Sequence, residues 1–301
     1  MSMIIDNAIL DTIGTEVDSN KSISTVFKEN GLDWEVLQKP VHDSVVDVHN
    51  SVINYRSDNN GFLGIVSNSH YKVVNNIDAF NFIDDLNSFT MEKVGMMNEG
   101  QEVFVVGKMN TMFEISENDQ VQLYASFIHG HNGKSAIRLI ITPIRMFCTN
   151  QLNLMLSNAA FSYSIRHSGD VYNKLCRIQQ AFNMNTEYML ELGTKLHGMT
   201  QAEANMSIDD FLDKLIPLES ESTKVVNRRE NIISTIRDLY NNKDDNQNYK
   251  GTQFGMLNAV ADYVSHQKIK QFSPESNTKA FFKSIENNEL LNKAHDILMA
   301  A

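Results

Sequence analysis

The sequence predicts an α+β fold, with an antiparallel β-meander and hairpin core, packed helices, and a helical C-terminal region. Short runs of β-branched and aromatic residues, separated by Asn-Gly turns, fill the stretch from residue 34 to residue 165. Apolar residues then recur at helical spacing from residue 171 onward. At 301 residues and 42% hydrophobic content, the chain is long enough to bury a large core.

We divide the chain into a loosely ordered N-terminus (1–20), an α+β core (21–185) and a helical C-terminal region (186–301). The core begins with a short helix, Ser22–Asn30. Strands follow, and Pro40 indicates a sheet edge there because proline cannot donate to a ladder. Asn60-Gly61 then predicts a hairpin turn between two β-rich runs.

A helix is predicted from Asn76, and the chain then returns to strands. The runs "EVFVVGKM", "VQLYASFIHG" and "KSAIRLIITPIR" form the predicted meander. Asn132-Gly133 predicts a type I′ turn, which makes the stretch from Lys134 to Met146 the return strand. Thr149 or Asn150 is expected to cap a helix after that strand.

Helices dominate the remainder of the sequence. Asp170 is the expected cap of a helix whose apolar residues recur at i, i+4, i+7 and i+11. Ser207 and Asp210 have capping-box spacing, and Pro217 ends that helix. One further helix is predicted to end at "NNKDDNQN", another to follow Gly251, and a final pair to span residues 276–300.

The charge of the chain is uneven, and this unevenness suggests a binding surface. Net charge is −11, and residues 1–100 carry six cations against fifteen carboxylates. Between residues 134 and 177 the balance reverses, with Asp170 the only carboxylate. A local basic face attracts phosphates even on an acidic protein, because potentials are screened within about 10 Å. The cations are equally consistent with a solvated surface. They are Lys134, Arg138, Arg145, Arg166, Lys174 and Arg177.

Arg145, Cys148 and Asn150 mark a predicted junction between a strand and a helix. Free backbone N–H groups at a helix start suit anion binding, and they are also satisfied by ordinary capping. Cys148 next to a helix start is a candidate nucleophile with a lowered pKa, although a free cysteine is more often buried packing. Cys148 and Cys176 are the two cysteines, which favours a reducing compartment.

The sequence contains no established catalytic or metal motif. His129, His131 and His167 lie in the central third but have no recognised ligand spacing, so we expect no metal and no cofactor. No Gly-rich phosphate loop or nucleophile elbow is present. Aromatic residues on the strands are expected to be buried packing; if exposed, they would form a base-stacking platform. These are Tyr55, Phe62, Tyr71, Phe104, Tyr124 and Phe127.

Three blocks of sequence resemble a known family. "PIRMFCTNQLNLML" followed by "SIRHS" is similar to the phage/plasmid-like protein family, catalogued as domain of unknown function 932. "HYKVVNNIDAFNFIDDL" and "GTQFGMLNAVADYVSHQ" resemble two further family segments, with Phe254 where many relatives have tryptophan. The resemblance implies a phage or plasmid setting and no settled activity. The signature positions are Pro143, Arg145, Cys148, Asn150, Arg166 and His167.

The predicted order of hairpin, helix, meander and helix also looks like the core of single-strand-annealing recombinases. Our leading hypothesis is a non-enzymatic protein that binds single-stranded DNA, with an annealing-like, homo-oligomeric mode included. The six cations above are predicted to contact phosphates, and Asn150 with nearby backbone amides is predicted to position those phosphates. The alternatives are a protein-interaction module, such as an inhibitor of a host defence complex, and an unrecognised enzyme or metalloprotein. With no apolar run near 18 residues and no signal peptide, we expect the bacterial cytoplasm and no membrane contact.

Overall fold

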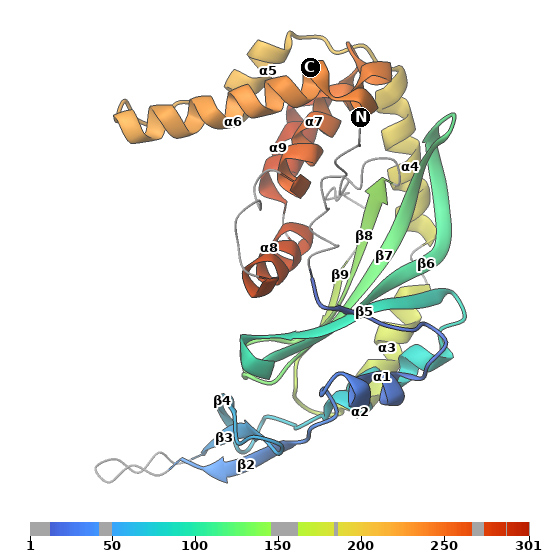
Figure 1. Ribbon diagram of the computed structural model, residues 1–301, viewed down its shortest axis with the longest axis vertical. Helices are drawn as coiled ribbons and strands as arrows, with labels where there is room; N and C mark the ends of the chain where they lie inside the picture. The colour runs from blue at the N-terminus through green and yellow to red at the C-terminus, as the bar shows by residue number, and fades with distance from the viewer. Residues whose placement is uncertain are drawn as a thin grey trace.

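The part of the chain that the structure describes folds around an antiparallel sheet of six strands in the order β1-β5-β6-β7-β8-β9 (Figure 1). A computed structural model describes residues 13–41, 50–145, 162–183, 186–266, 274–286 and 288–300. Strands β5 to β9 are sequential neighbours, so the predicted meander and the α+β class are confirmed. The strands are β1 (Thr15–Glu16), β5 (Phe89–Met97), β6 (Glu102–Ser116), β7 (Asp119–Gly130), β8 (Ile137–Arg145) and β9 (Ser162–Ile165).

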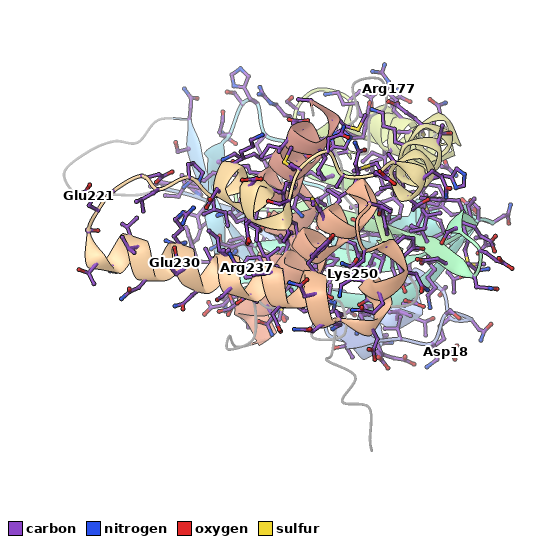
Figure 2. All side chains as sticks on the ribbon, turned by 90° about the horizontal axis from the view of Figure 1, so that it is seen from above. Asp18, Arg177, Glu221, Glu230, Arg237 and Lys250 are labelled. Atoms are coloured by element: carbon purple, nitrogen blue, oxygen red, sulfur yellow. The ribbon has the colours of Figure 1, made fainter. Side chains whose placement is uncertain are left out.

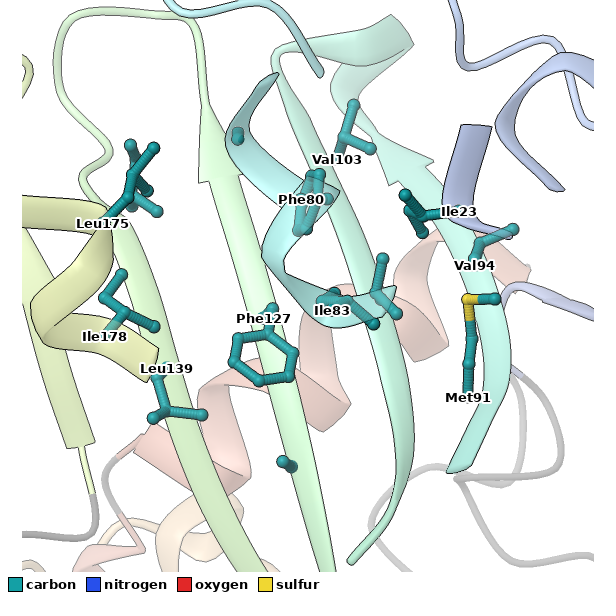
Figure 3. Packing of buried hydrophobic residues seen from close by; sticks show 14 of the residues in the cluster. Ile23, Phe80, Ile83, Met91, Val94, Val103, Phe127, Leu139, Leu175 and Ile178 are labelled. Atoms are coloured by element: carbon teal, nitrogen blue, oxygen red, sulfur yellow. The ribbon is translucent and has the colours of Figure 1, made fainter. Parts of the chain in front are cut away.

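One face of this main sheet is covered by α1 (Ile23–Glu29), α2 (Asn76–Phe80), the 3-10 helix η2 (Asn81–Asp85) and α3 (Val171–Asn183). The apolar stripe predicted for α3 faces the sheet, since Leu175 and Ile178 share a buried cluster with Leu139 of β8. Figure 3 shows Phe80 above the strand that carries Phe127. Burial of this stripe holds α3 against the end of the meander.

The other face of the main sheet is covered by α8 (Pro274–Glu286). Phe282 of α8 contacts Phe104 of β6 with ring centroids 5.0 Å apart, and Phe281 belongs to the same buried cluster. Strand β7 and the first half of β6 are therefore buried on both faces, which explains their nearly continuous apolar runs. Although α8 lies within the predicted helical region, it completes the core of the sheet.

A second, small antiparallel sheet packs against the turn between β7 and β8. Its strands are β2 (Val36–Pro40), β3 (Ser51–Arg56) and β4 (Phe62–Ser67), with β2 and β4 at the edges. Pro40 ends the edge strand β2, as predicted. A Cβ at Gly64 would lie 2.7 Å from the Asn132 backbone, so the two segments meet without room for a side chain. Asn54 strengthens the contact by donating to the His131 carbonyl at 2.8 Å.

The helical region packs at the opposite end of the main sheet (Figure 1). Its core includes Ile115 and Val121, which flank the turn between β6 and β7. The strand residues that flank this turn are therefore packed against the helices, while Glu117 and Asn118 at its tip are exposed. The helices are α4 (Thr186–Gln201), α5 (Ile208–Leu215), α6 (Thr223–Asn242), η4 (Asp244–Tyr249), α7 (Gln253–His266) and α9 (Glu289–Met299); η3 (Asn98–Gly100) links β5 to β6.

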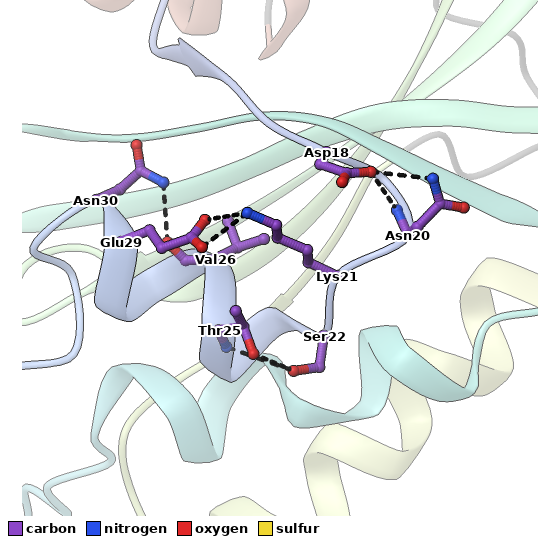
Figure 4. Close-up of polar contacts among 8 residues, drawn as sticks. All are labelled: Asp18, Asn20, Lys21, Ser22, Thr25, Val26, Glu29 and Asn30. Carbon is purple, nitrogen blue, oxygen red and sulfur yellow. Dashed lines mark hydrogen bonds and ion pairs between the residues drawn. The ribbon is translucent and has the colours of Figure 1, made fainter.

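Helix caps follow the local chemistry of the sequence. Ser22 caps α1 by accepting a hydrogen bond from the Thr25 amide, and Lys21 pairs with Glu29 at 2.7 Å (Figure 4). Ser207 accepts from the Asp210 amide and donates to its carboxylate, which confirms the predicted capping box of α5. Asp170 accepts from the Asn173 amide at the start of α3. The helix predicted over Ser22–Asn30 and the caps predicted at Asp170 and Ser207 are confirmed, because each depends on residues close in sequence.

The predicted type I′ turn at Asn132-Gly133 is wrong. Gly133 has a φ of +76°, but Asn132 lacks the positive φ that this turn requires. Instead, the Asn132 side chain accepts from the Lys134 and Ser135 amides, so β8 starts only at Ile137. The helix predicted after Thr149 and the N-terminal residues 1–12 lie outside the described residues. No helix in the described part of the chain is long and apolar enough to cross a membrane.

Candidate functional site

Four cations gather around the turn that joins β9 to α3. Arg166 begins this turn, and Lys174 of α3 donates to the Ser168 carbonyl at 2.6 Å. Lys72 lies beside the same turn because its amide donates to the His167 carbonyl at 2.9 Å. Arg177 lies three residues after Lys174 and therefore on the neighbouring turn of the helix.

The turn between β7 and β8 brings a fifth cation, Lys134, to the same end of the main sheet. Register pairs Ile137 with Ile165, so the start of β8 adjoins the end of β9. We call Lys72, Lys134, Arg166, Lys174 and Arg177 the basic rim. Four of these side chains are exposed, and Lys174 is half-buried. Within the described residues, the exposed four form no ion pair with a carboxylate.

Arg138 and Arg145 lie apart from the basic rim. Arg138 pairs with Glu102 at 2.9 Å, on the face of the sheet opposite α3. Burial lowers the pKa of Arg138, while the charge of Glu102 opposes that shift. Arg145 is the last residue of β8, roughly 24 Å along the strand from Arg138 at about 3.4 Å per residue. The structure thus brings together four of the six predicted cations. Cys148 and Asn150 lie outside the described residues.

Three buried histidines lie beneath the basic rim. The ring of His129 lies 4.3 Å from that of His131 and 5.1 Å from that of His167, measured between centroids. Tyr71 stacks on His167 at 4.8 Å, and Trp34 contacts His131 edge-on at 5.1 Å. Because His129 and His131 lie next to the Asn132-Gly133 turn, the sequence favours an exposed hairpin tip for both; this is wrong, since both are buried in a packed aromatic cluster. We call His129, His131 and His167 the histidine cluster.

Hydrogen bonds to carbonyl oxygens fix the proton positions of the histidine cluster. His129 donates from Nε2 to the Val74 carbonyl at 2.9 Å, and His167 donates from Nδ1 to the Lys72 carbonyl at 3.2 Å. His131 donates from Nε2 to the side-chain oxygen of Asn76 at 2.7 Å. The Nδ1 atoms of His129 and His131 are buried and have no hydrogen-bond partner among the described residues. All three rings are therefore bound in their neutral form.

Burial determines the acid–base behaviour of these rings. It lowers the pKa of His129 well below its usual value, with the neighbouring His131 and His167 adding to the shift. Burial also lowers the pKa of His131 to about 3 and that of His167 by a smaller degree. Burial raises the pKa of Tyr71. In the part of the chain with a described structure, no group of three or more His, Cys, Asp or Glu side chains is arranged to hold a metal ion.

The family-signature residues that the structure describes have different roles. Pro143 is buried in β8 opposite Leu123, and His167 belongs to the histidine cluster. Arg166 is exposed on the basic rim. Sequence reasoning missed Lys72, which reaches the rim through a contact with His167 across 95 residues of chain. No local pattern marks such a pairing.

The aromatic residues predicted to be buried divide into two groups. Phe104, Tyr124 and Phe127 are buried between the main sheet and its helices, as expected. Phe62 is 52% exposed, so the expectation is wrong for this residue. It lies directly opposite Tyr55 on the small sheet, which has only one face packed against the rest of the chain. Burial of one face alone explains the difference.

The opposite end of the main sheet carries an acidic pocket of about 450 Å³. Asp119 accepts from the Tyr249 hydroxyl at 2.6 Å, which ties the β6–β7 turn to η4. Neither lysine nor arginine lines the pocket, although four carboxylates do. The lining residues are Ser116, Glu117, Asn118, Asp119, Thr200, Gln201, Asp244, Asp245, Asn248 and Tyr249.

Comparison with curated proteins and with solved structures gives no significant match. A family model described as "Domain of unknown function (DUF932)" matches residues 62–296. That range includes the whole basic rim and the histidine cluster, together with the buried polar residues of α7. Because the match covers well over half of the 301 residues, the chain belongs to the DUF932 family of uncharacterised domains.

Proposed function

We propose that this protein binds single-stranded nucleic acid through the basic rim, without catalysing a reaction. The observation that supports the proposal is the gathering of Lys72, Lys134, Arg166 and Arg177 at one end of an otherwise acidic molecule. Phosphate neutralisation supplies most of the affinity in sequence-independent binding. Four exposed cations with no carboxylate partner among the described residues are available for it.

The separation of charge along β7 gives this binding a direction. The basic rim surrounds the end of β7 near Gly130, and the acidic pocket surrounds its start at Asp119. At about 3.4 Å per residue the two ends are roughly 37 Å apart, which exceeds the screening length of about 8 Å at physiological salt. A nucleic-acid strand bound at the rim is therefore too distant to be repelled by the pocket. A nucleic-acid strand that approaches the pocket itself is repelled by its carboxylates.

Lys174 has a supporting role in this proposal. Its ammonium group is held by the Ser168 carbonyl at 2.6 Å, so it fixes the shape of the turn after Arg166 as well as adding charge. We include in the proposal a cytoplasmic location and a role in phage or plasmid nucleic-acid metabolism; that role rests on the family resemblance alone. An annealing-like, oligomeric mode also remains part of the proposal.

Fluorescence anisotropy of a labelled 20-nucleotide oligo(dT), titrated at 50 mM and 200 mM salt, tests the proposal. The test variant replaces Lys72, Lys134, Arg166 and Arg177 with glutamine. The loss of four phosphate contacts should weaken binding and reduce the magnitude of the salt slope by about 3, at roughly 0.7 per contact on single strands.

A matched control replaces two lysines and two arginines of the helical region, Lys224, Lys250, Arg228 and Arg237, with glutamine. Figure 2 shows Arg177 at the edge of the molecule, well apart from Arg237 and Lys250. Both variants change net charge equally, so a general electrostatic effect acts on both. Absence of binding by the natural protein at 50 mM salt, or equal loss in the two variants, refutes the proposal.

A further inference from the structure

The small sheet presents an outer face that nothing in the described chain covers. Register assigns the positions of this face, because Leu37, Tyr55 and Phe62 form one cross-strand row. Lys39, Ile53 and Ile65 form the next row. The opposite face carries Val52, Leu63 and Val66, which are buried.

The exposure of the outer face is unusual for apolar side chains at neighbouring positions. Phe62 is 52% exposed, Ile65 55% and Leu37 39%, while Tyr55 and Ile53 are partly exposed. Scattered apolar residues on a surface need no explanation, but a contiguous set marks a binding site. This set is contiguous because each residue is adjacent to another across or along the strands.

The charge on this face favours a polyanion. Its eight positions consist of the two rows above together with Ser51 and Ser67. They include one lysine and no carboxylate, in a chain whose net charge is −11, and the adjoining pair of Glu35 and Ser57 adds one exposed carboxylate at the border of the face. The ammonium of Lys39 lies 5.2 Å from the centre of the Tyr55 ring, so the cation and the aromatic face are presented together.

We propose that the Tyr55–Phe62 pair stacks unpaired bases while Lys39 contacts the adjoining phosphates. This inference rests on the proposed function and narrows the ligand to nucleic-acid strands whose bases are unpaired. The β7–β8 turn that carries Lys134 packs against the opposite face of the same small sheet, at Val66 and Gly64, so the outer face and the rim lie on either side of β4. Aromatic residues on an antiparallel sheet stack two or three bases in known RNA-binding modules.

The size of the face separates this ligand from a protein partner. Taking about 200 Å² for each large side chain, the three most exposed residues present roughly 300 Å² of apolar surface. A stable protein interface needs about 800 Å² from each partner. The outer face is therefore too small for a protein interface by itself and large enough for two or three stacked bases.

Part of the proposed platform lies outside the family match. The family match begins at Phe62, so β2 and β3 with Leu37, Lys39 and Tyr55 precede it. The proposed platform thus combines residues from outside the family match with Phe62 and Ile65 inside it.

The experiment compares oligo(dT) with an abasic oligonucleotide of the same length, measured by competition against a labelled strand; oligo(U) extends the comparison to RNA. The natural protein should prefer oligo(dT) over the abasic strand by at least tenfold, since each stacked base contributes about 5-fold to 150-fold. Tyr55→Ala with Phe62→Ala should reduce this ratio to about 1 and leave the affinity for the abasic strand unchanged. The single substitution Tyr55→Phe keeps an aromatic ring at this position and should leave the ratio as it is in the natural protein.

Met112→Ala with Leu218→Ala is the matched control, because each of these residues is 52% exposed elsewhere on the molecule. Circular dichroism melts verify that every variant folds. Equal binding of oligo(dT) and the abasic strand by the natural protein overturns the stacking inference and leaves the proposed function standing. Absence of binding to both oligo(dT) and the abasic strand by the natural protein overturns both proposals. If the double variant changes the oligomeric state and leaves the ratio intact, the face joins copies of the chain and the inference is wrong.

Discussion

Acidification from pH 7.5 to pH 5.5 should destabilise this protein through the histidine cluster. His129 and His131 are completely or almost completely buried, and their rings are held as neutral donors by Val74 and Asn76. In the unfolded chain both rings are free to take up a proton near the ordinary histidine pKa of about 6.5. Because the unfolded state binds more protons, stability falls as pH falls below that value.

The magnitude follows from the pKa shifts. At pH 5.5 an unfolded histidine is about 90% protonated, while the folded His131, with a pKa of about 3, remains neutral. This difference costs about 1.4 kcal/mol per histidine. His129, whose pKa is also lowered well below its usual value, adds a similar amount. The pair should therefore reduce the free energy of unfolding by about 3 kcal/mol, with a further loss from His167.

Urea denaturation at the two pH values measures this difference. His129→Gln with His131→Gln should lower stability at both pH values and remove most of the pH dependence. His70→Gln, at an exposed position, is the control and should leave the dependence unchanged. In the natural protein, the imidazole NMR resonances of His129 and His131 should not titrate between pH 7.5 and 5.5, a readout that does not depend on the variants folding.

One buried carboxylate acts in the opposite direction. Burial raises the pKa of Asp262, against the opposing charges of Lys243 and His266. A raised carboxyl pKa makes the folded state bind more protons, so this residue gains stability as pH falls. Asp262→Asn separates its contribution. The reasoning about the histidine cluster is refuted if the natural protein, after that correction, loses less than about 1 kcal/mol, or if the His129 and His131 substitutions leave the loss unchanged.

Two further predictions concern packing and a buried ion pair. Gly64→Ala should lower the free energy of unfolding by about 2 kcal/mol, because the added Cβ meets the backbone of Asn132 at 2.7 Å; Gly198→Ala, in α4 with open space around it, should instead raise stability by up to about 1 kcal/mol in the same denaturation assay. Arg138→Met should cost about 2 kcal/mol because it leaves the carboxylate of Glu102 largely buried and unpaired. Adding Glu102→Gln should recover most of that loss in a double-mutant cycle, and a loss that persists would contradict this account.

The sequence predicted those parts of the fold that depend on nearby residues. The caps formed by Ser22, Asp170 and Ser207 each link residues three apart, so a motif contains the whole interaction. The strands of the meander were predicted for the same reason, since alternation and turns are local signals. At Asn132 the type I′ prediction failed. The same Asn-Gly pair also allows a turn in which the asparagine side chain accepts hydrogen bonds from the amides that follow it.

The candidate site was predicted only in part because it depends on contacts distant in sequence. Arg138 belongs to the basic stretch of the sequence. Glu102 of β6 reaches it because β7 pairs with β6 on one side and with β8 on the other. Charge patterning along the chain contains no information about that partner. Lys72 joins the rim for the converse reason, since tertiary contact with His167 adds a cation that lies in an acidic part of the sequence.

The histidine cluster explains how the rim and the small sheet are held together. His167 binds the Lys72 carbonyl through its ring and the Lys72 amide through its own carbonyl, which fixes the rim residue on β9's exit turn. The carbonyl of His131 accepts from Asn54 of β3, which fixes the small sheet on the β7–β8 turn. Because His129 contacts both rings, both attachments share one buried group of neutral imidazoles. Charging that group would place repelling cations in the core between the basic rim and the small sheet, where both attachments are made.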